Sequence, residues 1–170
     1  MDKEIRVYLS ARVSPDAQDW NEYVCSFLKP PIKVFLPHKY VPDCKHEDMP
    51  LKVYLQDMSE IKKSHACLLL PEFGNDCSCE IGWYAQSKKP VVCFVDDQTK
   101  WLNNIQKVKL GIDVVVTTNK TTYGLLQKDD ILKDAKLLLI RDISELNDVI
   151  KEYKTYPKLA ALEKKRVRTH

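Results

Sequence analysis

With 170 residues, the chain is long enough to bury a hydrophobic core, and 44% hydrophobic and 30% charged residues are typical of an ordinary folded domain. No stretch approaches the roughly 18 consecutive apolar residues of a membrane span, so we expect no membrane partner. Residues 158–170 contribute +4 to the net charge of +3, which leaves −1 for residues 1–157. Because that body lacks the basic face of a nucleic-acid-binding protein, we predict one domain over 1–157 and a basic C-terminal tail over 158–170.

Short apolar runs alternate with amphipathic segments along the chain. The predicted strands are 5–9, 32–36, 66–70, 91–95 and 114–117, with 137–140 as a sixth or a late edge strand. The predicted helices begin after Ser14-Pro15 and near Asp76, cover about 51–63 and 100–107, and close the chain around 143–153. This alternation predicts a doubly wound α/β sheet, and the absence of a G-x-G-x-x-G motif speaks against the usual dinucleotide site.

The distribution of cysteines bears on location and on metals. The chain begins directly with a predicted strand, without a secretory signal, so we expect a cytoplasmic protein with reduced cysteines. Cys77-x-Cys79, with His38, Cys44 and His46 upstream, could be read as zinc ligands, but the spacing matches no standard zinc motif. We therefore expect no metal and no other cofactor.

Residues 66–97 form the central unit of the chain. The apolar run 66–70 is followed by a loop rich in Pro, Gly and Asn, a helix, and the apolar run 91–95. Two parallel strands joined in this way place the loop at the carboxyl end of the first strand, where open α/β sheets bind ligands. Asp76 and Glu80 lie in that loop and in the first turn of the helix, so we expect two carboxylates in one crevice.

Several of these side chains suggest chemistry. The helix dipole should keep Glu80 ionised, and an ionised carboxylate can act as a nucleophile or stabilise a cation. Asp57 lies between Tyr54 and Ile61 near the apolar face of its helix, where a charge is costly without a partner or a task. Arg12 leaves the first strand beside the same crevice and can bind an anion or hold a carboxylate in place.

Each residue also has a purely structural interpretation. Asp76 can cap a helix, Glu80 can offset the helix dipole, and Asp57 can pair with a lysine. Trp83 and Tyr84 follow Glu80 at helical spacing and could form an aromatic wall, although such residues more often pack in a core. The apolar positions of the helix predicted over 51–63 are Leu51, Leu55, Met58 and Ile61.

Two motifs carry a resemblance to a known family. They are Asp57-x₃-Ile61-x₂-Ser64 and Asp76-x-Ser78-x-Glu80-Ile81-Gly82-x-x-Ala85-x₃-Lys89-Pro90-Val91. Together with the first strand and its loop, they resemble the nucleoside 2-deoxyribosyltransferases over roughly residues 5–97. The resemblance implies a flavodoxin-like, mainly parallel five-stranded sheet with helices on both faces. It also implies a homo-oligomer that uses no cofactor and whose partners are a nucleoside or nucleotide and a free nucleobase.

The resemblance also implies roles for individual residues. Glu80 would attack the anomeric carbon of a 2′-deoxynucleoside, and a second base or water would then take the sugar. Asp57 and Asp76 would protonate and bind the base or orient the sugar. The expected substrate-binding residues are Tyr8, Ser10, Arg12, Ser78 and Trp83.

Two alternatives to a transferase remain open at this point. The Ser10-Ala11-Arg12 loop is similar to that of nucleoside 5′-monophosphate N-glycosidases, which hydrolyse their substrate and hold a phosphate near this loop. A catalytically inactive nucleotide-binding domain would need only the crevice. Asn119 is a candidate for the asparagine that the transferases often lend to a neighbouring subunit.

Overall fold

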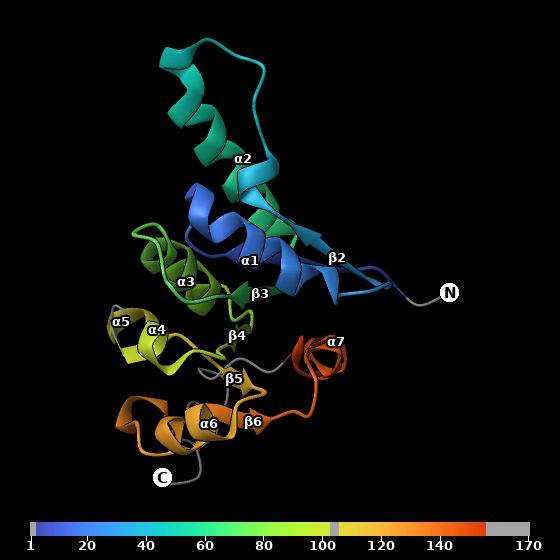
Figure 1. The fold of residues 1–170 in the computed structure, drawn as a ribbon. Helices are drawn as coiled ribbons and strands as arrows, with labels where there is room; N and C mark the ends of the chain where they lie inside the picture. The colour runs from blue at the N-terminus through green and yellow to red at the C-terminus, as the bar shows by residue number, and fades with distance from the viewer. Residues whose placement is uncertain (1–2, 103–105, 156–170) are drawn as a thin grey trace, which may run out of the picture.

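Six parallel strands form one sheet across the described residues, 3–102 and 106–155, of the computed structural model (Figure 1). In chain order they are β1 (Ile5–Ser10), β2 (Ile32–Phe35), β3 (Ala66–Leu69), β4 (Val91–Phe94), β5 (Val114–Thr117) and β6 (Lys136–Leu139). Their order across the sheet is β2-β1-β3-β4-β5-β6, and every neighbouring pair is parallel. The winding direction therefore reverses between β1 and β3, which is where doubly wound sheets bind ligands.

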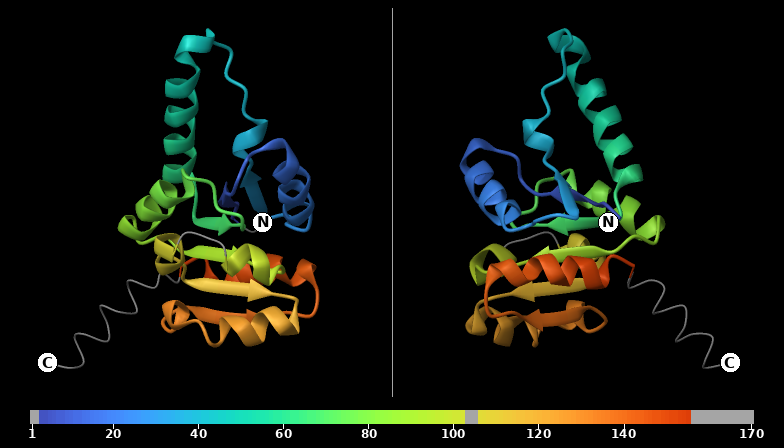
Figure 2. Two further views of the ribbon diagram at one scale, coloured as in Figure 1. Left: turned by 60° about the vertical axis from the view of Figure 1, so that its left-hand side comes forward. Right: turned by 90° about the vertical axis from the view of Figure 1, so that its right-hand side faces the viewer.

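Helices cover both faces of this sheet (Figure 2). One face packs against α1 (Pro15–Ser26) and α7 (Leu146–Tyr153). The other face carries α2 (Met49–Lys63), α3 (Cys77–Gln86), α4 (Gln98–Leu102), α5 (Gln106–Leu110) and α6 (Lys120–Leu126). Short 3₁₀ turns complete the described chain at η1 (Pro37–Lys39), η2 (His46–Asp48), η3 (Asp130–Leu132) and η4 (Ile143–Glu145).

The strands divide their side chains between the two cores. In β1, Val7 and Leu9 join the cluster under α1 and α7, whereas Tyr8 joins the opposite cluster, since successive residues of a strand point to opposite faces. Every residue of β3, β4 and β5 is buried, as expected for central strands of a parallel sheet. The edge strands β2 and β6 remain partly exposed.

The doubly wound parallel α/β fold predicted from the sequence is confirmed. The sheet has six strands rather than five, because β6 pairs in parallel with β5. Where one helix was expected over 100–107, the described residues form the two short helices α4 and α5, and α6 was not anticipated. The predicted tail over 158–170, with the last residues of the predicted domain, lies outside the described residues.

The helix α2 projects from the body of the protein instead of lying along the sheet (Figures 1 and 2). Ile61, near its C-terminal end, is the one buried residue of this helix. The apolar residues Leu51 and Leu55 are 59% and 53% exposed. Sequence periodicity thus identified the apolar side of the helix, but the body of the protein covers only part of it.

Within residues 3–102 and 106–155, no helix has both the length and the apolar character that crossing a lipid bilayer requires.

A close approach of α3 to the segment after α5 depends on Gly111. A Cβ atom at this position would lie 2.3 Å from Cγ2 of Ile81, a buried residue of α3. Gly111 does not have a positive φ, so its backbone conformation would also suit alanine. The glycine is therefore required by the space available and not by its dihedral angles.

We expect Gly111→Ala to lower the free energy of unfolding by about 1–3 kcal/mol, because the added methyl group overpacks the contact with Ile81. Urea denaturation measures this change. The matched control is Gly124→Ala within α6, where an added Cβ meets nothing within 4 Å and should raise the free energy of unfolding by about 0.5–1 kcal/mol. Equal stability of Gly111→Ala and the wild type would show that the two segments do not approach so closely.

Candidate active site

The carboxyl group of Glu80 lies at the carboxyl end of β1. The loop that leaves β3 leads into α3, and Glu80 follows one turn later. The Tyr8 hydroxyl donates a hydrogen bond of 2.6 Å to Oε1, and the Ser10 hydroxyl donates one of 2.5 Å to Oε2. Tyr8 and Ser10 are fully buried, and Glu80 is 9% exposed. Both oxygens of this carboxylate are thus held by residues of a neighbouring strand.

The protonation of Glu80 depends on opposing influences. Burial raises the pKa of this carboxyl above its ordinary value, and the negative charge of Asp76 raises it further. The hydrogen bonds from Ser10 and Tyr8 act in the opposite direction, since they stabilise the carboxylate. The sequence suggested that N–H groups at the start of the helix would keep Glu80 ionised. In the structure, the backbone N–H of Glu80 donates to the Asp76 carbonyl over 3.1 Å. The side chain of Glu80 is held by the hydroxyls of Tyr8 and Ser10.

Asp57 is a second perturbed carboxyl beside Tyr8. Its Oδ1 atom is buried and has no hydrogen-bond partner among the described residues. Burial is the larger cause and the nearby charge of Glu80 the smaller one that together raise the pKa of Asp57 to about 6. The Tyr8 hydroxyl acts in the opposite direction and lowers this pKa. That hydroxyl carries one proton and donates it to Glu80, so the two carboxyls compete for it. No lysine in the described part of the chain pairs with Asp57, so no ion pair offsets the free-energy cost of burying this carboxyl group.

Asp76 completes a group of three acids. It immediately precedes α3 at the N-cap position, but its side chain makes no capping hydrogen bond. Asp76 is exposed, and its charge raises the pKa of both Asp57 and Glu80. Ser78 is also exposed, in the first turn of the same helix. The acids predicted from the sequence are therefore neighbours in space, with Asp76 on the open side and Glu80 at the buried side.

Arg12 is engaged elsewhere. Its guanidinium group forms an ion pair of 2.8 Å with Glu72, a second ion pair with Asp16, and a hydrogen bond of 2.7 Å to the Ser14 hydroxyl. These contacts tie the loop after β1 to the loop after β3 and to the start of α1. Because two carboxylates surround one guanidinium group, this corner has no excess positive charge.

The two aromatic residues that follow Glu80 lie in different surroundings. Tyr84 is fully buried and shares a hydrogen bond of 2.5 Å with the Ser64 hydroxyl, so it belongs to the core. Trp83 is partly buried and contacts Tyr54 of α2 edge to face, with ring centroids 6.1 Å apart. The ring that stacks on Tyr8 is Phe35, at 5.8 Å and 19° between the planes. Sequence reasoning missed Phe35, although it ends β2 directly opposite Tyr8 in the strand register.

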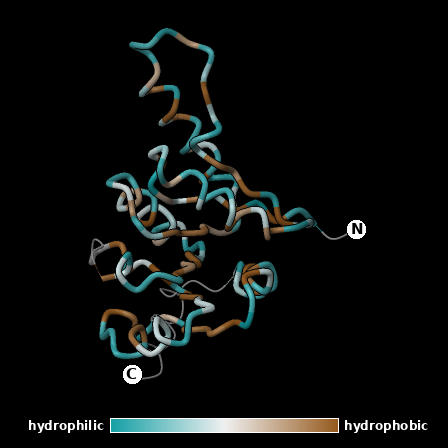
Figure 3. The backbone as a smooth tube through the Cα atoms, in the orientation of Figure 1, coloured by the Kyte–Doolittle hydropathy of each residue, from teal (hydrophilic) through white to brown (hydrophobic). Residues whose placement is uncertain are grey.

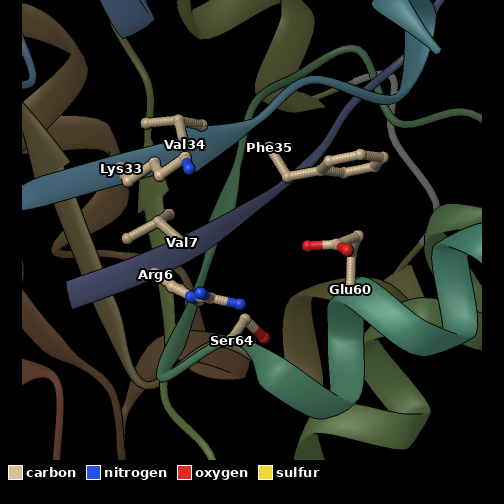
Figure 4. A pocket seen from close by; sticks show the side chains of 7 residues that line it. All are labelled: Arg6, Val7, Lys33, Val34, Phe35, Glu60 and Ser64. Carbon is tan, nitrogen blue, oxygen red and sulfur yellow. The ribbon is translucent and has the colours of Figure 1, made fainter. Parts of the chain in front are cut away.

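A cavity of about 180 Å³ opens between the β1–β2 edge of the sheet and α2 (Figure 4). Its lining residues are Arg6, Val7, Lys33, Val34, Phe35, Glu60 and Ser64. Phe35 therefore contributes both to this cavity and to the stack on Tyr8. Of its charged groups, Arg6 pairs with Glu4 at 2.7 Å and Glu60 pairs with Lys63 at 2.9 Å.

Metal-ligating side chains do not gather near this site. Cys77 is buried, and Cys79, two residues later on the opposite side of α3, is exposed, so the two thiols do not converge. Within residues 3–102 and 106–155, no group of three His, Cys, Asp or Glu residues could hold a metal ion. Asn119, the candidate for a residue lent to a neighbour, accepts hydrogen bonds from the backbone N–H groups of Thr121 and Thr122 at the start of α6.

Comparisons with known proteins place the chain by fold alone. A scan against protein-family models gave no match, and a search of curated protein sequences gave none either. Among solved structures, the chain is similar to a conserved protein from Enterococcus faecalis V583, with a TM-score of 0.52 and 17% sequence identity. The alignment covers 88% of this chain and 98% of that one. This likeness supports the α/β architecture.

The raised pKa of Asp57 leads to a prediction about stability. The folded protein holds this proton more tightly than the unfolded chain, so the contribution of Asp57 to stability falls as the pH rises from the ordinary pKa of 3.8 to about 6. Asparagine cannot ionise. We therefore expect Asp57→Asn to be more stable than the wild type by about 1 kcal/mol at neutral pH, after allowance for partial solvent screening, with no difference near pH 4.

Urea denaturation of both proteins at several pH values measures this difference. Asp43→Asn, at an exposed position in the loop before α2, is the control, and its difference from the wild type should not change with pH. A wild type that is more stable than Asp57→Asn at neutral pH would show that the carboxylate has a stabilising partner after all.

Proposed function

We propose that this protein cleaves the N-glycosidic bond of 2′-deoxynucleosides and transfers the deoxyribosyl group to another nucleobase. The observation that carries this proposal is the buried Glu80 carboxylate, held by Tyr8 and Ser10 beside a second carboxyl, Asp57, whose pKa is about 6. A fixed carboxylate beside an acid that can be protonated is the minimal set of groups for glycosyl transfer. The motif resemblance to the nucleoside 2-deoxyribosyltransferases supports the choice of substrate.

The proposed reaction proceeds in two displacements. An oxygen of Glu80 bonds to the anomeric carbon of the sugar while the bond from that carbon to the base nitrogen breaks, and the electron pair of that bond leaves with the base. A nitrogen of a second base then attacks the same carbon, its proton passes to the Asp57 carboxylate, and the bond from the carbon to Glu80 breaks to release the carboxylate. Each step inverts the anomeric carbon, so the product retains the configuration of the substrate. The two hydroxyl donors fix the orientation of Glu80 throughout.

Asp57 is the proposed proton donor. A group with a pKa of about 6 is partly protonated near neutral pH and can give its proton to the leaving base. The acids around the site would also stabilise the positive charge that develops on the sugar ring. Asp76 and Ser78, both exposed at the start of α3, would bind the hydroxyls of the sugar or the edge of the base.

The electrostatics of the crevice favour a nucleoside over a nucleotide. Asp57, Asp76 and Glu80 lie close enough to shift one another's protonation. Arg12, the cation of the adjacent loop, is already paired with two carboxylates. A 5′-phosphate would bring further negative charge into this acidic region, so we rank the hydrolysis of 5′-monophosphates below transfer from free nucleosides.

Glu80→Gln provides the main test. The substitution keeps the size and much of the hydrogen-bonding capacity of the side chain but removes the nucleophile, so transfer from deoxyadenosine to cytosine should fall by at least about 10⁴-fold. Chromatography of the bases measures the transfer. Intact-protein mass spectrometry of the wild type, incubated without acceptor base, should show a deoxyribosyl adduct on Glu80. The control is Glu145→Gln, which alters a glutamate of η4 that pairs with Arg141.

Asp57→Asn separates the proton donor from the nucleophile. This variant should transfer about 10²–10⁴-fold more slowly, yet still form the adduct on Glu80. Transfer by Glu80→Gln at the wild-type rate would rule out the covalent mechanism. Absence of transfer in the wild type with any deoxynucleoside would reject the proposed function as a whole.

Arg12→Ala tests the preference for free nucleosides. Since Arg12 is held by Glu72 and Asp16, we expect its loss to change the ratio of kcat/KM for deoxynucleosides and their 5′-monophosphates by less than about threefold. If Arg12 bound the 5′-phosphate, Arg12→Ala would instead reduce the preference for monophosphates by about 30-fold or more. Arg141→Ala, which removes an exposed arginine of a different loop, is the matched control. A wild type that prefers monophosphates would identify the protein as an N-glycosidase.

A further inference from the structure

An apolar stripe on α2 lies outside the core. Leu51 and Leu55 are more than half exposed, the adjacent Tyr54 is 50% exposed, and Met58 is partly buried. In Figure 3, brown hydrophobic segments continue along the part of α2 that extends beyond the rest of the protein. A helix of 15 residues with one buried residue gains little from its own packing, and isolated helices of this length are marginal in water. Such a helix is stabilised when a second apolar surface packs against its exposed stripe.

The stripe has charged residues of opposite sign at its two ends. Asp48, Leu55 and Lys62 are spaced seven residues apart, and Leu51 and Met58 lie between them at the spacing of a heptad pattern. Asp48 and Lys62 are both exposed, and neither side chain has an ion-pair partner among the described residues. The pattern is that of a helix that pairs with another helix, with an acid before the apolar residues and a base after them.

We propose that α2 pairs in antiparallel orientation with α2 of a second copy of this chain, around a twofold axis at Leu55. Asp48 and Lys62 are equally distant from Leu55 along the helix, so the axis places Asp48 opposite Lys62 of the partner subunit, twice per dimer. A parallel pair would instead place like charges opposite one another. The apolar centre of the interface consists of Leu51, Leu55 and Met58 from each copy.

Other occupants fit this surface less well. Residues 41–63 carry five acidic and four basic side chains, so this segment has no excess positive charge to hold it on an anionic membrane surface. Outside the α2 arm (residues 41–63), the large exposed apolar residues of the described chain lie on separate elements: Val13, Tyr23, Leu102, Leu110 and Leu139. The α2 arm is therefore where exposed apolar surface is concentrated, and its ends are complementary to themselves.

Sedimentation velocity of the full chain tests the proposal. We expect a reversible dimer with a dissociation constant of about 1–100 µM, as is typical of a small interface. Leu55→Glu places two like charges at the twofold axis and should give a monomer that still unfolds cooperatively. The control is Leu110→Glu, which changes a leucine of α5 that is 57% exposed and should leave the dimer intact. A wild type that is monomeric at about 200 µM, or a dimer that survives Leu55→Glu, would overturn the proposal.

The orientation has its own test. Asp48→Lys and Lys62→Asp should each weaken the dimer by about tenfold, since each places like charges opposite one another. A mixture of the two variants should associate like the wild type, because both charge pairs are restored in the mixed dimer, and so should the double variant. If neither the mixture nor the double variant regains association, the helices are not antiparallel and the proposed geometry is wrong. These outcomes do not depend on enzymatic activity.

Discussion

The hydrogen bonds from Tyr8 and Ser10 to Glu80 join the first turns of α3 to the centre of the sheet. A buried carboxylate is costly, and here two buried hydroxyls provide the compensation. They can do so because β1 and β3 are neighbours, so the loop after β3 delivers Glu80 beside the carboxyl end of β1. The position of the proposed nucleophile thus follows from the reversal of strand order between these two strands.

The second acid depends on a helix that is less firmly held. Asp57 reaches Tyr8 from α2, whose attachment to the body lies mainly at its C-terminal end, where Ile61 is buried and Lys89 donates hydrogen bonds of 2.9 and 2.7 Å to the carbonyls of Ile61 and Lys62. A partner helix along the exposed stripe would hold the remaining turns. Under the proposed mechanism, burial of this unpaired acid keeps its proton-donating form accessible near neutral pH.

Local sequence determined the order of the elements and the composition of the crevice. Continuous apolar runs such as 66–70 and 91–95 can only be strands buried on both faces or parts of a core helix, and the intervening breakers select the first. Parallel strands then place the loop between them at one edge of the sheet, which brings Asp76 and Glu80 to that edge without further information. The apolar side of α2, and the unusual position of Asp57 near it, were likewise readable from helical periodicity.

Tertiary structure decided which groups these residues meet. The contact of Tyr8 with Glu80 depends on the directions of two side chains that lie 72 residues apart in the sequence, and the stack of Phe35 on Tyr8 depends on strand register. The sequence allowed Arg12 to bind an anion or a carboxylate, and it binds Glu72 because the loop that follows a different strand lies beside it. Periodicity showed that Leu55 belongs to an apolar stripe but not what covers it. Sequence determines which face of an element is apolar, whereas only the packing of distant segments determines whether that face is buried.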